Sequence, residues 1–284
     1  MTNKEIIKAL DELDLSSYPY DEVKRLVSLF QPKVLRLTIT AGAIIERIRP
    51  DVNVYERKDV SYRPADKNEK PQRATLPKKT AFYGTICHES DPLYNNRYIA
   101  LLEASELLKA GKYAEGTEQY TLSRWFTNDP LRLAVFVHDT VYPDVYNNVL
   151  LDMAKREFER SRTSFVDAIQ FDDYEKYVTE QFAKPVVPPH DYEYIISATI
   201  ADMLMHANQL DGVMYPSVPS LGEFGMNVAL RKDVADDKMV LQEVNELEYK
   251  QKGGEGRFSF IKKAIPDEID NHGLKKWHYM NYYE

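Results

Sequence analysis

The sequence has a single cysteine, Cys87, among its 284 residues. One cysteine cannot form an internal disulfide, and it cannot build a zinc cage that needs several cysteine ligands. The six histidines are scattered, and no pair has the helical spacing of zinc ligands beside a carboxylate base. We therefore expect no metal site, and a reducing, cytoplasmic setting fits this cysteine usage best.

Long apolar runs are also missing. No segment approaches the roughly 20 apolar residues that cross a bilayer, and the first residues contain no signal-peptide core. The net charge of −8, from 37 Lys and Arg against 45 Asp and Glu, argues against broad nucleic-acid binding. A few arginines can still form a local pocket for one anionic ligand. We expect an intracellular protein without a membrane or nucleic-acid partner.

Two common catalytic motifs are absent as well. The glycines of Gly253-Gly254-Glu255-Gly256 lack the lysine and the helix of a phosphate-binding loop, so they predict a hairpin turn. No Gly-x-Ser-x-Gly elbow occurs, and no base lies near Ser217 in the sequence. Tyrosine, by contrast, occurs 20 times, and most of these rings are expected to line core edges with a wet hydroxyl.

The N-terminal residues 1–33 have apolar side chains at helical spacing, in Ile6 to Leu13 and again in Val23 to Phe30, with Pro32 ending the second run. This pattern predicts a helical hairpin ahead of the main domain. Its apolar stripe could mediate a homodimer or partner docking, or it could lie against the sheet. The second arrangement is the commoner one for such helices.

Residues 34–284 predict one further domain of the α+β class, with a mostly antiparallel sheet interrupted by helices. Branched, partly alternating runs predict strands over 34–40, 43–48, 81–86, 120–126, 131–138, 212–215, 226–230, 239–249 and 257–265. Helical periodicity predicts a helix over 96–110 and a helical insert at about 144–210, made of 144–160, 164–182 and 192–210. The charged, proline-bearing stretch 51–79 predicts a long loop.

Several residue types with binding chemistry remain. Arg47 and Arg49 lie on the same face of a predicted strand end, where two guanidinium groups could grip phosphate oxygens. Surface salt bridging is the alternative for them. Tyr83 precedes a glycine that allows close approach of a ligand, although packing is the commoner role of a tyrosine. Glu103 is an acid in an apolar helical stretch, where it could face either solvent or a pocket.

The segment from Asp211 to Val218 is the most informative one. A short apolar run ends at Tyr215-Pro216-Ser217, and a second run, Gly225-Met226-Asn227-Val228-Ala229-Leu230, begins after a glycine-containing loop. This pattern is typical of two buried strands whose connecting loop brings a polar group into a pocket.

Taken in order, these segments resemble the RES domain, a family named for an arginine, a glutamate and a serine. The matching pieces are Glu46-Arg47-Ile48-Arg49, Gln72-Arg73-Ala74-Thr75, Phe82-Tyr83-Gly84, Ala100-Leu101-Leu102-Glu103 and the segment that ends in Ser217. The resemblance covers about residues 34–246. Three positions differ from the family pattern, since Glu46 replaces a tyrosine, Gln72 a glycine and Thr75 an asparagine.

The resemblance implies an ADP-ribosyltransferase-like fold that binds NAD as its substrate and breaks the nicotinamide–ribose bond by hydrolysis, phosphorolysis or ADP-ribosyl transfer. Glu103 would stabilise the positive charge on the ribose, while Arg47, with Arg73 in support, would hold the pyrophosphate. Tyr83 would stack on nicotinamide or close the pocket wall, and Ser217 would donate a hydrogen bond. Arg49 and Tyr215 would complete the NAD-binding set.

The family also includes toxins that an antitoxin protein neutralises, so the resemblance implies such a partner here. The alternative is a module that keeps the fold and binds a partner without turnover. The substitutions at Glu46 and Thr75 motivate this alternative, because an unpaired glutamate beside Arg47 would neutralise a phosphate site.

Overall fold

The computed structural model describes residues 1–30, 34–50, 54, 56–91, 96–143, 147–164, 168–207, 210–264, 269–270, 273–274 and 278–279. Within these residues the main sheet consists of β1 (Arg36–Ile39), β2 (Ile44–Pro50), β3 (Ala81–Ile86), β4 (Gly116–Thr127), β5 (Leu131–Val135), β6 (Gly212–Pro216), β7 (Met226–Arg231), β8 (Met239–Lys252), β9 (Glu255–Ala264) and β12 (His278–Tyr279). The strand order is β1-β5-β6-β7-β3-β2-β4-β8-β9-β12, and β5 and β6 are the parallel pair. The predicted α+β class with a mostly antiparallel sheet is confirmed.

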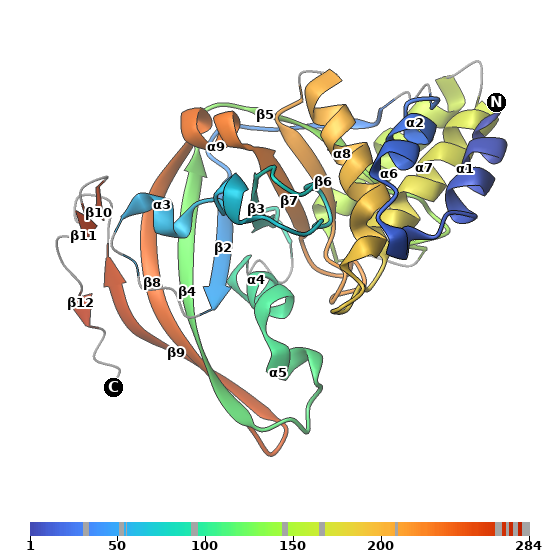
Figure 1. Cartoon of the computed structure of the whole chain (residues 1–284). Helices are drawn as coiled ribbons and strands as arrows, with labels where there is room; N and C mark the ends of the chain where they lie inside the picture. Colours follow the sequence, from blue (N-terminus) through green and yellow to red (C-terminus); the bar gives the residue numbers. More distant parts are fainter. Residues whose placement is uncertain are drawn as a thin grey trace.

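Besides α6 (Val149–Ser164), further helices gather at one end of the sheet, beside β6 (Figure 1). They are α1 (Asn3–Asp11), α2 (Tyr20–Val27), α7 (Ala168–Ala183) and α8 (Ile195–Ala207), with the short 3-10 helices η1 (Leu15–Ser17) and η3 (Asp191–Tyr194) between them. Their apolar faces share one buried cluster with residues of β5, β6 and β7, such as Ala134, Val213 and Ala229. The N-terminal hairpin is therefore buried against α7 and α8, with Ile6 and Val23 fully enclosed.

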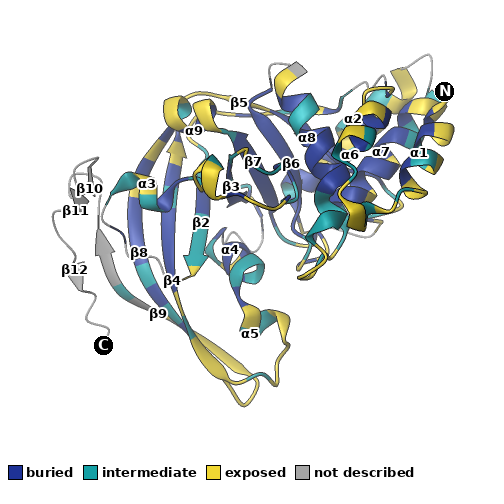
Figure 2. Cartoon of the chain, in the orientation of Figure 1, coloured by how far each residue is buried: buried dark blue, intermediate teal, exposed yellow. Residues whose placement is uncertain are grey.

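Helix α6 (Val149–Ser164) contributes to a second cluster. Leu151 and Phe158 of this helix share that cluster with Met214 of β6 and Val228 of β7. Because side chains alternate along a strand, neighbouring residues of β6 and β7 enter different clusters, and both faces of the central strands are buried (Figure 2). The near-continuous apolar runs of these strands follow from this double coverage.

The sheet narrows to a single point of pairing between β2 and β3. Only Glu46 and Thr85 are registered there, whereas all seven residues of β2 are registered with β4. At this point a Cβ on Gly84 would lie 2.5 Å from Ile45 Cγ2 and 3.1 Å from the Glu46 carbonyl oxygen. Glycine is required for the two halves of the sheet to approach this closely.

Helices α4 (Asn96–Ala104) and α5 (Glu106–Lys109) lie over β2, β4 and β8, where Leu101 packs with Leu122 and Leu247. The other helices are α3 (Arg57–Val60), η2 (Ala65–Lys67) and α9 (Lys232–Lys238). A separate two-stranded sheet is formed by β10 (Ile269–Asp270) and β11 (Gly273–Leu274). The predicted hairpin turn joins β8 and β9, with positive φ at Gly253 and Gly254.

Some predicted elements need correction. The helix expected over 96–110 is two helices, because Ser105 ends the first and caps the second by accepting from the Leu108 N–H at 3.1 Å. The loop expected over 51–79 contains α3 and η2, and α9 was not predicted. Pro32 and residues 144–146, 165–167, 208–209 and 265, which bound other predicted elements, lie outside the described residues.

Candidate functional site

Glu103 stands at the centre of the candidate site. Its Oε1 accepts a 2.7 Å hydrogen bond from the Ser217 hydroxyl and another of 2.7 Å from the side-chain amide of Asn227. The carboxylate comes from the last turn of α4, Ser217 directly follows β6, and Asn227 lies on β7. Two donors on one oxygen hold the carboxylate in a defined orientation.

The loop between β6 and β7 brings the serine to Glu103. The Gly222 N–H donates to the Ser217 carbonyl oxygen at 2.9 Å, and the buried Asn148 amide donates to the carbonyl oxygens of Gly222 and Gly225. Gly225 has φ +51°, and a Cβ there would collide with Ile99 of α4. The glycine therefore lets α4 approach the loop, which places Glu103 beside Ser217.

Two buried tyrosines, Tyr142 and Tyr215, lie near this carboxylate. Burial raises the pKa of Tyr142 to about 12, and the negative charge of Glu103 contributes to the rise. Burial also raises the pKa of Tyr215 well above its ordinary value, with smaller contributions from Tyr83 and Glu103, against the opposing charge of Arg73. These phenols are neutral at physiological pH, so the site combines one carboxyl group with aromatic rings and hydroxyl groups.

Tyr83 is fixed in place from the 72–75 segment. Its hydroxyl accepts from the Ala74 N–H at 3.0 Å and shares a 2.6 Å hydrogen bond with the Thr75 hydroxyl. Burial raises the Tyr83 pKa to about 12, although these bonds and the charges of Arg73 and Arg47 oppose the rise. Thr75, which departs from the family pattern, therefore has a clear contact, and it positions Tyr83.

Arg73 lies beside the tyrosines, but its guanidinium is engaged with the backbone. It donates to the carbonyl oxygens of Phe182 at 2.5 Å and Lys184 at 2.9 Å, and it lies over the rings of Tyr194 and Tyr215 at 5.0 and 5.9 Å. These bonds satisfy carbonyl groups at the C-terminal end of α7. Arg73 thus joins the helical insert to the site wall.

Arg47 spans the point where β2 and β3 separate. Its Nη1 donates to the Tyr83 carbonyl oxygen at 2.6 Å, its guanidinium lies 5.7 Å from the Phe82 ring centroid, and its Nε is buried with no hydrogen-bond partner among the described residues. Burial, aided by the charge of Arg49, lowers the Arg47 pKa to about 9. A buried cation with an unused donor is a favourable position for an anion.

Arg49 belongs to a different place. Its guanidinium donates to the Asp59 carbonyl oxygen at 2.5 Å and lines a cavity of about 700 Å³. The side chains that line this cavity do not include Glu103 or Ser217. The structure therefore brings together five of the predicted residues, namely Glu103, Ser217, Tyr83, Tyr215 and Arg73. Arg47 lies at the strand separation, and Arg49 lies in the cavity.

Glu46 does not neutralise Arg47, contrary to the expectation that motivated the non-enzymatic alternative. It is 1% exposed, and its Oε1 lies 3.1 Å from Arg97 Nε and 3.5 Å from Arg124 Nε. Arg97 also contacts Glu243 at 2.9 Å. Alternation along β2 turns Glu46 to the face opposite Arg47. The ion pairs attach the start of α4 to the sheet, and thereby support Glu103 at its other end.

No base lies near Ser217 in the sequence, but the fold brings Glu103 to it as its hydrogen-bond partner. Two site residues were not predicted. Asn227 was visible in the sequence as part of Gly225-Met226-Asn227, but its contact with Glu103 depends on how α4 packs. Tyr142 lies in a segment without any motif, and its ring is in reach of a Cβ at Gly222.

Comparison with known proteins assigns no family. No family model matches the chain, and no curated protein matches it. Among the described residues, no three His, Cys, Asp or Glu side chains are grouped so that they could hold a metal ion. In the same part of the chain, no helix combines the length and apolar character needed to cross a membrane.

Proposed function

We propose that the chain is an NAD-cleaving enzyme with an ADP-ribosyltransferase-like fold. The supporting observation is the Glu103 carboxylate, held by Ser217 and Asn227 from two further segments of the chain and close to the buried Tyr142 and Tyr215. This arrangement joins an oriented negative charge to a wall suited to a flat aromatic leaving group. The ordered motif resemblance of the sequence points to the same chemistry.

The reaction breaks the bond between the ribose anomeric carbon and the nicotinamide nitrogen. The bonding electrons leave with nicotinamide, which becomes neutral and needs no proton, and positive charge develops on the ribose ring. An oriented carboxylate stabilises that charge and accepts hydrogen bonds from the ribose hydroxyls. Glu103 has this role, while Ser217 and Asn227 are positioning residues, because their protons are donated to Glu103 Oε1.

The remaining residues orient NAD. Arg47 provides the positive charge for the pyrophosphate, since its Nε has no partner among the described residues. Tyr83 and Tyr215 form the wall for nicotinamide. Arg73 supports this wall through its contacts with the rings of Tyr194 and Tyr215.

Three acceptors can complete the reaction, namely water, inorganic phosphate or a protein side chain. A toxin role with a neutralising antitoxin partner follows from the family resemblance, and the single cysteine favours a cytoplasmic location. Purified protein is incubated with NAD, with and without phosphate, and released nicotinamide is followed by chromatography. A phosphate requirement identifies phosphorolysis, and labelling of a protein identifies transfer.

The decisive comparison is Glu103→Gln against Glu106→Gln, an exposed glutamate on α5. We expect Glu103→Gln to lower the rate about 100-fold or more, as loss of electrostatic stabilisation does in other enzymes. Glu106→Gln should keep the wild-type rate. Absence of nicotinamide release by the wild-type protein, or an unchanged rate in Glu103→Gln, would overturn the proposal.

A binding module without turnover is the second candidate. One observation favours it, because the Arg73 guanidinium donates to backbone carbonyl groups and not into an open site. The argument from Glu46 no longer supports it, since Glu46 is paired with Arg97. Calorimetry separates the two candidates: NAD binding with turnover supports the enzyme, and tight association with a cellular protein without NAD binding supports the module.

A further inference from the structure

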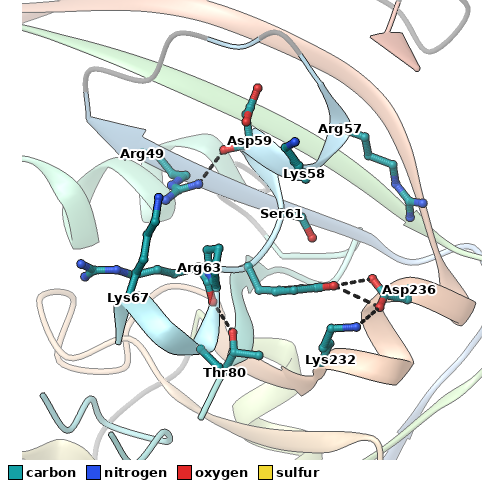
Figure 3. A pocket seen from close by; sticks show the side chains of 13 residues that line it. Arg49, Arg57, Lys58, Asp59, Ser61, Arg63, Lys67, Thr80, Lys232 and Asp236 are labelled. Atoms are coloured by element: carbon teal, nitrogen blue, oxygen red, sulfur yellow. Dashed lines mark hydrogen bonds and ion pairs between the residues drawn. The ribbon is translucent and has the colours of Figure 1, made fainter. Parts of the chain in front are cut away.

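The cavity of about 700 Å³ lies outside the Glu103 site and is strongly basic. Figure 3 shows its lining, which comes from the end of β2, the 57–67 segment, Thr80 and the start of α9. Among the described residues, six cationic side chains line it against two acids: Arg49, Arg57, Lys58, Arg63, Lys67 and Lys232, against Asp59 and Asp236. This excess is unexpected in a chain of net charge −8.

The two acids neutralise part of this charge. The Asp59 carboxylate accepts from the Glu56 N–H at 2.8 Å, and in Figure 3 it points away from Arg49, which bonds the Asp59 carbonyl oxygen instead. Asp236 is used by Lys232 at 2.8 Å and by the Tyr62 hydroxyl at 2.9 Å. Lys58 is paired with Glu56 at 2.7 Å, so the arginines and Lys67 carry most of the positive charge that remains.

The uncompensated charge is concentrated on one side. Figure 3 shows Arg49, Arg63 and Lys67 gathered on the side of the cavity away from Lys232 and Asp236. The pKa of Arg49 is lowered by burial and then by the charge of Arg63, while the charge of Asp59 opposes this shift, so the two guanidinium groups lie close enough to repel one another. In the part of the chain that the structure describes, no ion pair joins Arg63 or Lys67 to an acid.

Two of the arginines that line the cavity are held in fixed positions. Arg49 and Arg57 are half-buried, and each is held by a bond to a backbone carbonyl oxygen, of Asp59 at 2.5 Å and of Met239 at 2.8 Å. Arg57 also lies over the Trp125 ring at 5.3 Å. A neutral carbonyl oxygen fixes a guanidinium without cancelling its charge, so both groups are preorganised for an anion.

We propose that this cavity binds an organic di- or triphosphate, such as a nucleoside diphosphate or triphosphate, at a site separate from Glu103. The phosphates lie against Arg49, Arg63 and Lys67, whose combined charge matches two or more phosphate groups. The organic part lies along Tyr62, Pro64 and Ala65, which line the same cavity. A volume of this size lies within the usual range of about 300–1,000 Å³ for small-ligand sites.

A small ligand fits the cavity better than a nucleic acid. Nucleic-acid recognition uses basic side chains that extend along a surface, whereas here the fixed guanidinium groups of Arg49 and Arg57 line a cavity of about 700 Å³. The site also does not depend on the proposed NAD cleavage, since none of its lining residues contacts Glu103 by a described hydrogen bond. The two proposals can therefore fail separately.

Isothermal titration calorimetry of the full chain tests the site with ATP, ADP, pyrophosphate, AMP and adenosine. We expect ATP and ADP to bind about tenfold or more tightly than AMP, because charge-assisted bonds to the second phosphate are lost, and adenosine to give no heat. The double variant Arg63→Glu with Lys67→Glu changes two exposed rim positions, and should weaken ATP binding at least about 100-fold.

The matched control is Lys24→Glu with Arg156→Glu, which makes the same charge change at exposed positions of α2 and α6. It should bind ATP as the wild type does, as should Glu103→Gln, and circular dichroism should show that every variant is folded. Equal ATP affinity in the rim variant and the wild type, or no ATP binding by the wild type, overturns the proposal. So does a single-stranded RNA that binds more tightly than ATP and is competed by it.

Discussion

The hydroxyl of Ser217 donates a 2.7 Å hydrogen bond to Oε1 of Glu103, although 114 positions separate the two residues in the sequence. The bond exists because Gly225 lets α4 approach the loop that follows β6. It assigns the serine proton to the carboxylate, and so makes Ser217 an orienting group for Glu103. The chemistry of the proposed site then depends on how well this carboxylate is held.

Removal of the Glu103 donors provides the first prediction. Ser217→Ala and Asn227→Ala each remove one hydrogen bond to the carboxylate. A hydrogen bond to a charged acceptor contributes about 1.5–3 kcal/mol. We expect each to lower kcat for nicotinamide release about tenfold or more, with a smaller change in KM, and less than Glu103→Gln does. Steady-state kinetics on NAD measure this split.

Rescue by a conservative change tests the positioning role of the serine. Ser217→Thr keeps a hydroxyl and should recover much of the rate that Ser217→Ala loses. If Ser217→Ala removes activity as completely as Glu103→Gln, the serine reacts directly and the positioning role is wrong.

The lowered pKa of Arg47 predicts that NAD binding depends on pH. Its pKa is lowered from 12.5 to about 9, mainly by burial, so the guanidinium is charged below that pH and increasingly neutral above it. An anion at Arg47 is therefore bound more weakly as pH rises through about 9. We expect KM for NAD to increase across this window, while kcat changes less.

Arg47→Met isolates this effect. At neutral pH it should raise KM about tenfold or more, since a charge-assisted bond is lost, and it should remove the increase near pH 9. Arg156→Met, at an exposed position of α6, is the control and should behave as the wild type. A wild-type increase that persists in Arg47→Met would assign the titration to another group.

The positions of the strands along the chain could be predicted from the sequence more easily than the way in which the strands pair in the sheet. Alternation and branched residues identify the runs that become β6, β7 and β8, because both are local properties. The helix α9 escaped prediction because Lys232–Lys238 is short and mostly charged, with Val234 and Ala235 as its buried residues. The break at Ser105 depends on a cap, which a count of apolar residues does not detect.

The same is true of the site, where residue types could be predicted from the sequence and their contacts could not. Glu103 and Ser217 are found by motif, because the residue types and their order are visible in one dimension. The partners of Glu46 are not, since Arg97, Arg124 and Glu243 reach it through the register of β2, β4 and β8 and the seating of α4. The sequence placed Glu46 beside Arg47, whereas the strand turns their side chains to opposite faces.

Glu175 leads to a prediction of stability against pH. It is 1% exposed on α7, its Oε2 is buried without a hydrogen-bond partner among the described residues, and burial raises its pKa well above the ordinary value of 4.5. The folded chain therefore retains a proton that the unfolded chain has already lost. Stability from this group is present below pH 4.5 and is lost as pH rises toward the raised value.

Glu175→Gln keeps the shape of the protonated side chain and has no proton to lose. We expect its free energy of unfolding, measured in urea between pH 4.5 and 8, to decline less with pH than that of the wild type. The control is Glu180→Gln, at a half-exposed position on the same helix. Parallel curves for Glu175→Gln and the wild type would show that Glu175 is ionised in the folded chain.

The ion pairs beneath α4 supply the last prediction. Arg97→Met leaves Glu46, which is 1% exposed, with Arg124 as its remaining cation at 3.5 Å. Breaking a buried pair from one side costs about 3–5 kcal/mol, and we expect the lower end or slightly less because the Arg97 side chain is 33% exposed. Burial already raises the Glu46 pKa against the opposing charge of Arg97, so the variant should lose further stability as pH rises.

The double variant Glu46→Leu with Arg97→Met separates the charge from the packing. Replacing both partners by apolar groups removes the buried charge, and such changes are close to neutral in other proteins. Urea unfolding of the two single variants and the double variant should therefore give a coupling energy of about 2 kcal/mol or more, with the double variant more stable than Arg97→Met. Additive losses would show that Arg97 holds α4 through its alkyl chain and its bond to Glu243, and that the Glu46 carboxylate contributes little to the seating of Glu103.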